Sequence, residues 1–171
     1  MTELKLMMLA FFCVFVLFTA CANQEPQEES LSQNAETAKE LLEGKGYEIL
    51  SYKGSYEKKV ERAALAKMPE RNFWAVQDVP PDRFIGETVE VFQFNVTNHP
   101  LDKAYVNDEN YTHAHVSVYI NNNKPFGGSS VPIGNKAYSS PGNSIDGRTA
   151  EVVQDDYEQW VETWLSNYGD E

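Results

Sequence analysis

Strict alternation of apolar and other residues over positions 113–120 constrains the fold of this chain more than any other feature of its sequence. Every second residue from Ala114 to Ile120 is apolar, whereas His113, His115, Ser117 and Tyr119 stand between them. Side chains alternate between the two faces of a β-strand, so this pattern predicts a half-buried strand of an antiparallel sheet. The turn-forming residues at 121–125 and the segment that follows them predict a hairpin.

Three further segments have the composition of strands, and turn-forming residues separate them. They are residues 47–52, 73–77 and 88–97. The third is the strongest prediction, because Phe92, Phe94 and Val96 fall on one face and indicate that this face is buried.

Two helices are expected in the N-terminal part of the folded region. The first begins at Ser32 or Asn34, either of which can cap it, and ends near Gly44. The second is expected over residues 56–67, where apolar residues recur at helical spacing before Pro69.

The C-terminal helix has the clearest periodicity in the chain. Aromatic and aliphatic residues recur three and four positions apart over 157–168, after a start at Asp155 and Glu158 that resembles a capping box. We expect its tryptophans to pack it onto the sheet, and we expect residues 134–148 to form a long loop. The sequence therefore predicts one α+β domain over residues 32–171, mainly an antiparallel sheet with two N-terminal helices and a C-terminal amphipathic helix.

The first 20 residues have the organisation of a bacterial signal peptide. One cation, Lys5, precedes an unbroken apolar run from Leu6 to Phe18. This run of 13 residues is shorter than the roughly 20 that a membrane-spanning helix needs, and it matches the apolar region of a cleaved signal.

The residues Leu17 to Cys21 resemble the lipobox of bacterial lipoproteins, although Phe18 stands where leucine is usual. That resemblance implies a diacylglyceryl group on Cys21, cleavage before it, and further acylation of the new N-terminus, for example with palmitate. Cleavage would also remove Cys13 and leave Cys21 as the only cysteine, which explains an exported chain without a disulfide. Residues 21–31 are then the lipidated cysteine and a flexible tether rich in Gln and Glu.

The net charge of −12 limits the partners of this domain. Phosphate backbones and anionic lipid headgroups repel a polyanion, so we expect no nucleic-acid binding and no membrane attachment by charge. The lipid on Cys21 would supply the membrane attachment instead, at the extracytoplasmic face of the cell membrane.

Several short segments of the domain look like those of a group of small lipoproteins from Bacillus-type bacteria. They are residues 46–52, 74–77, 96–101, 126–129 and 157–160. The likeness extends over most of residues 35–168. Because that group has no established activity, the resemblance implies a cellular address and a fold, and it implies no active site.

Two functions of different classes are compatible with the sequence. No catalytic motif is present, so the first is a non-enzymatic lipoprotein that binds an envelope protein or a small ligand without a cofactor. The alternative is a metal-binding protein or weak metallohydrolase. It would use His113 and His115, which share one face of a strand, together with His99, and Asp102 and Asp108 could supply further ligands.

Overall fold

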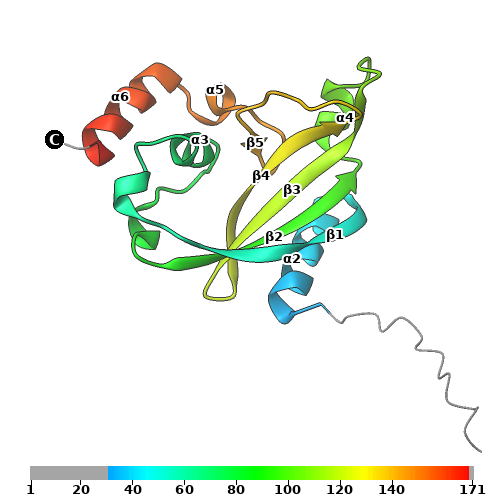
Figure 1. Ribbon diagram of the computed structural model, residues 1–171, viewed down its shortest axis with the longest axis horizontal. Helices are drawn as coiled ribbons and strands as arrows, with labels where there is room; N and C mark the ends of the chain where they lie inside the picture. Colours follow the sequence, from blue (N-terminus) through cyan, green and yellow to red (C-terminus); the bar gives the residue numbers. More distant parts are fainter. Residues whose placement is uncertain (1–30, 170–171) are drawn as a thin grey trace, which may run out of the picture. The chain divides into compact units, whose positions relative to one another are not determined.

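The computed structural model describes residues 31–169 (Figure 1), so the predicted signal peptide and Cys21 lie outside the described residues. One antiparallel sheet of five strands, in the order β1-β2-β3-β4-β5, forms the centre of the domain. The strands are β1 (Glu48–Lys59), β2 (Thr88–Thr97), β3 (Tyr111–Asn121), β4 (Lys124–Gly134) and β5 (Asn143–Ser144). The predicted α+β class is confirmed.

Helix α2 (Gln33–Gly44) covers one face of the sheet (Figure 1). The hydroxyl of Ser32 accepts a hydrogen bond from the Ala35 N–H, so the predicted cap is confirmed. Ala35, Ala38 and Leu42 are buried against the predicted apolar face of β2 and β3. A first hydrophobic core therefore lies between α2 and the sheet.

A second hydrophobic core lies beyond the other face of the sheet. It joins the segment after β1, α3 (Glu70–Ala75), the 3₁₀ turn Asp82–Phe84 and α6 (Tyr157–Tyr168), and its largest members are Trp74, Phe84 and Trp164. The Trp164 Nε1–H donates to the Leu65 carbonyl over 2.8 Å. Helix α6 therefore packs mainly on this segment, whereas the sequence predicted that it packs on the sheet.

The predicted hairpin joins β3 to β4 through Asn122 and Asn123. Both asparagines have positive φ, 50° and 60°, as a two-residue turn of type I′ requires. The buried face of β3 is also as predicted, whereas the opposite face is only partly open. Near the hairpin, the ring of Tyr119 packs 4.5 Å from that of Phe73, and Ser117 is buried.

Two predicted elements are wrong. Residues 56–59 continue β1, and a 3₁₀ turn (Arg62–Ala64) follows in place of the predicted second helix. Strand β1 continues through Gly54. The φ of this glycine is +102°, and it lies at a shift in the register between β1 and β2. Residues 73–77, predicted as a strand, belong mainly to α3.

Short elements complete the domain, and they position the loops. Helix α4 (Pro100–Ala104) follows β2, and α5 (Ala150–Val153) precedes α6. The cap of α6 is Asp156, one residue after the predicted Asp155, and its carboxylate accepts from the Gln159 N–H. Among residues 31–169, none of the helices is both long and apolar enough to cross a membrane.

Candidate functional site

His113 and His115 lie on the face of β3 that points away from α2, as the alternation predicted. The Asn95 amide oxygen is 2.9 Å from His115 Nδ1, and the Gln93 amide nitrogen is 3.2 Å from His115 Nε2. Donation from Gln93 to Nε2 and from Nδ1–H to Asn95 satisfies both contacts with a neutral ring. A metal ion at His115 would have to displace Gln93.

His99 lies apart from this pair, in the core on the α2 side of the sheet. Its ring is 4.7 Å from that of Tyr47, and it is 1% exposed. His99 caps α4, since Nδ1 accepts from the Leu101 N–H over 3.1 Å, and Nε2–H donates to the Ile145 carbonyl over 3.0 Å. Both of its nitrogens are thus used within the fold.

The structure therefore does not bring the three histidines together. Within the described range, 31–169, no group of three or more His, Cys, Asp or Glu side chains could hold one metal ion. The two aspartates proposed as additional ligands have other partners. Asp102 accepts from Tyr111 and from the His99 N–H, and Asp108 accepts from Tyr138 over 2.7 Å. Metal binding by His113 and His115 alone stays a prediction.

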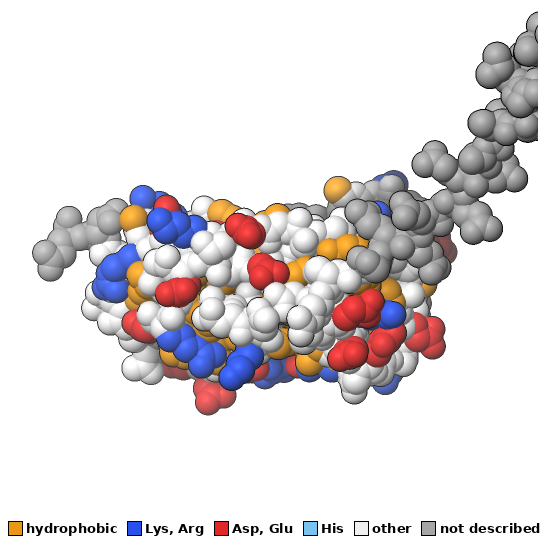
Figure 2. All heavy atoms as spheres, turned by 90° about the horizontal axis from the view of Figure 1, so that it is seen from below, with side chains coloured by type: hydrophobic (Ala, Val, Ile, Leu, Met, Phe, Trp, Pro, Cys, Tyr) orange, Lys and Arg blue, Asp and Glu red, His pale blue; other side chains and the backbone are white. Residues whose placement is uncertain are grey.

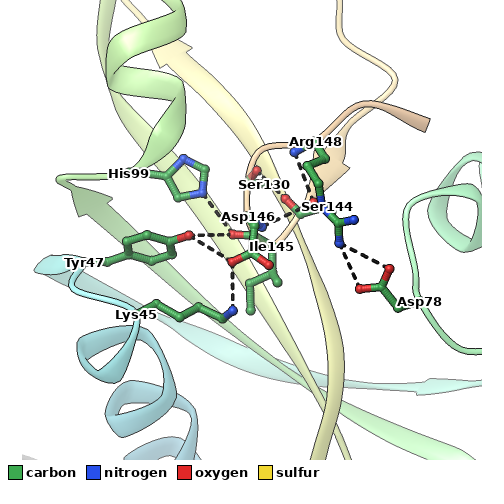
Figure 3. A network of polar contacts seen from close by, with 9 residues as sticks. All are labelled: Lys45, Tyr47, Asp78, His99, Ser130, Ser144, Ile145, Asp146 and Arg148. Carbon is green, nitrogen blue, oxygen red and sulfur yellow. Dashed lines mark hydrogen bonds and ion pairs between the residues drawn. The ribbon is translucent and has the colours of Figure 1, made fainter. Parts of the chain in front are cut away.

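The predicted loop over 134–148 is held to the domain by a polar network (Figure 3). Strand β5 within it pairs with β4, and the buried Ser130 hydroxyl donates to the Ser144 carbonyl over 2.8 Å. The Ser144 hydroxyl in turn accepts from the N–H groups of Asp146 and Arg148. Figure 3 shows Lys45, Tyr47 and His99 converging on residues 145–146 from the other side.

The groups of this network hold the loop against the rest of the domain. Lys45 forms an ion pair with Asp146 over 2.8 Å, and the Tyr47 hydroxyl donates to the same carboxylate over 3.2 Å. Burial, with the nearby Asp146 charge, raises the pKa of Tyr47 well above its usual value. Burial lowers the pKa of His99, so the ring is neutral at pH 7. Neither group is poised as a base beside a nucleophile.

An open cleft between α6 and the segment Trp74–Asp82 is the best candidate for a ligand site. Its volume is about 360 Å³. Trp74, Trp160 and Trp164 all line it, and these are all three tryptophans of the chain. Aromatic side chains with a few polar groups are typical of small-molecule sites.

The polar groups of this cleft come from both of its walls. Asp78 and Asp82 stand on the α3 side, and Thr163 and Asn167 stand on α6, all exposed. The buried Trp74 Nε1–H has no acceptor among the described residues. The exposed Thr163 hydroxyl and Asn167 amide both donate and accept, so the cleft offers hydrogen-bond donors and acceptors together beside aromatic rings.

Contacts at the C-terminal end of α6 hold this wall of the cleft in place. The Tyr168 hydroxyl donates to Asp82 over 2.8 Å, and burial together with this bond raises the pKa of Tyr168 to about 12. The Arg62 guanidinium donates to the Asn167 carbonyl over 2.7 Å. Because Tyr168 remains protonated at neutral pH, its bond to Asp82 persists there.

Sequence reasoning identified the tryptophans of α6 as core residues and missed the cleft. The structure confirms burial for Trp164 but leaves Trp160 half-buried. Figure 2 shows one face of the molecule, where acidic and basic side chains are interspersed and hydrophobic side chains appear in small areas.

Comparison with protein-family models, with curated proteins and with solved structures finds no match to this chain. The function is therefore inferred from the side chains of the described domain and from the N-terminal sequence.

Proposed function

We propose that this protein is a lipid-anchored, extracytoplasmic binding protein without enzymatic activity, and that its ligand occupies the α6 cleft. The observation that carries the proposal is the convergence of all three tryptophans with carboxylate, amide and hydroxyl groups on one open cleft. A lining of aromatic side chains with a few polar groups is typical of sites that bind small molecules.

The N-terminal sequence supports the anchor. The apolar run and the lipobox-like residues before Cys21 lie outside the described residues, and they are the grounds for expecting a diacylglyceryl group on that cysteine. A tether after Cys21 would hold the domain near the membrane, where envelope components are its potential ligands.

Intact mass spectrometry of the chain isolated from its native membrane fraction tests the anchor. We expect a species that begins at Cys21 and carries added acyl mass, and we expect the Cys21→Ala variant to accumulate as the unprocessed precursor. An unlipidated soluble species in both preparations would contradict the proposed anchor and localisation.

The binding role is tested separately, by tryptophan emission of the full chain during titration with a low-molecular-mass extract of the cell envelope. A saturable change is expected in the natural chain, and its loss is expected in Trp160→Ala. An unchanged spectrum in the natural chain would contradict the binding role.

A further inference from the structure

We propose that the α6 cleft binds a neutral saccharide, an inference that rests on the proposed function and adds the class of ligand. The cleft combines partly exposed indole surface, mixed hydrogen-bond donors and acceptors, and a lining without basic side chains. Each of these three features restricts the chemistry of the ligand, and a saccharide satisfies all of them.

The aromatic surface of the cleft comes mainly from a row of rings on α6. Trp160 and Trp164 stack with centroids 4.7 Å apart, and Trp164 contacts Tyr168 at 4.5 Å. The stack fixes the rings, and Trp160 stays half-buried, so a part of its indole is accessible to a ligand. The C–H groups of a sugar ring are apolar and can cover such a surface.

The hydrogen-bonding groups of the cleft require a ligand that both donates and accepts. Asp78 and Asp82 are carboxylates and only accept. The Asn167 amide and the Thr163 hydroxyl do both. A sugar hydroxyl also does both, so several neighbouring hydroxyls can satisfy this mixed set.

The charges around the cleft favour a neutral ligand over an ion. The residues that line the cleft include two carboxylates and neither lysine nor arginine, so an anion would find no basic partner among them. Both carboxylates are already engaged, because Asp78 pairs with Arg148 at 2.9 Å and Asp82 accepts from Tyr168. Their attraction for an organic cation is therefore reduced.

The test is a fluorescence titration of the full chain in a polyoxyethylene detergent, which carries no sugar headgroup. The probes are the β-1,4-linked tetramer of N-acetylglucosamine, maltotetraose and choline chloride. Because all three tryptophans line the cleft and Trp160 is partly exposed, we expect a ligand there to change their emission. We expect a saturable change with at least one tetrasaccharide, insensitive to added salt, and none with choline.

Two variants locate the binding. Trp160→Ala removes the accessible ring and should weaken saccharide binding by about tenfold or more. Asn167→Ala removes one exposed amide and should weaken it by roughly two- to tenfold, the range of a single hydrogen bond. The Asn167 side chain makes no hydrogen bond within residues 31–169, so its variant should fold normally. Ser166→Ala, on an exposed residue of α6 outside the cleft, is the matched control and should bind like the natural chain.

Three outcomes would overturn the saccharide assignment. They are no response to either tetrasaccharide, equal affinity in the natural chain and in both cleft variants, and salt-sensitive binding of choline in their place. If the envelope extract changes the emission while both tetrasaccharides fail, the ligand class is wrong and the proposed binding role stands. If the extract also fails, the binding role is contradicted as well.

Discussion

At the scale of single residues, His99 shows how one side chain joins three parts of the fold. It lies two residues after the end of β2, its Nδ1 caps α4, and its Nε2–H donates to the Ile145 carbonyl of the loop. A neutral ring is required, because Nδ1 accepts a hydrogen bond while Nε2 donates one. Protonation would break the cap and place a charge in the core.

The stability of the domain should therefore fall in mild acid. Burial lowers the pKa of His99 below its ordinary value, so below about pH 6.5 the unfolded chain binds a proton that the folded chain does not. The free energy of unfolding therefore has its full value above that pH and decreases as the pH falls below it. Each such proton contributes a slope of up to about 1.4 kcal/mol per pH unit.

Urea unfolding between pH 7.5 and 5 measures this slope. His99→Asn keeps an acceptor for the Leu101 N–H and removes the titrating ring, so its slope should be shallower than that of the natural chain. Some slope should remain, since burial also lowers the pKa of His115, with nearby His113 and Lys53 as additional causes. Parallel curves for the two proteins would rule out His99 as a source of acid sensitivity.

At the scale of elements, either of two adjacent aspartates could cap the N-terminus of α6. The sequence predicted a cap at Asp155, whereas the structure has the Asp156 carboxylate accepting from the Gln159 N–H over 3.0 Å. Asp156→Ala should reduce the free energy of unfolding by about 1 kcal/mol, and Asp155→Ala should leave it nearly unchanged. Denaturant unfolding of the two variants decides between them, and equal losses would contradict the assignment of the cap to Asp156.

Elements with a local pattern were predictable from the sequence, and elements set by pairing were not. Strand β2 and the buried face of β3 follow their alternation, and Ser32 caps α2 as its position indicates. Residues 56–67 have apolar spacing compatible with a helix, but pairing with β2 holds residues 56–59 in β1. Local propensity is a weak guide where tertiary contacts compete with it.

The two candidate sites also differ in how far the sequence could predict them. The pair His113 and His115 could be found because both lie on one strand, yet nothing in the sequence shows that His99 faces the opposite side of the sheet. The α6 cleft could not be predicted, because Trp74 is distant in sequence from Trp160. Only the packing of α6 on the segment after β1 brings them together.

At the scale of the whole molecule, we expect the net charge and the proposed lipid anchor to have separate roles. The net charge of the chain is −12, and residues 1–21 contribute one acidic and one basic residue, Glu3 and Lys5, which cancel. A chain that begins at residue 22 therefore keeps the full −12. Such a domain is repelled by anionic lipid surfaces, so its membrane attachment should depend on the lipid alone.

Cosedimentation with vesicles tests this division of roles. A chain of residues 22–171 should stay in the supernatant with vesicles of anionic phospholipid at low and at physiological ionic strength, because lower salt only lengthens the reach of the repulsion. The lipidated chain from native membranes should sediment with the same vesicles and with neutral ones, since its acyl chains insert in either bilayer. Sedimentation of the 22–171 chain with anionic vesicles that increases as salt is removed would reveal a basic surface. It would then contradict attachment through Cys21 alone.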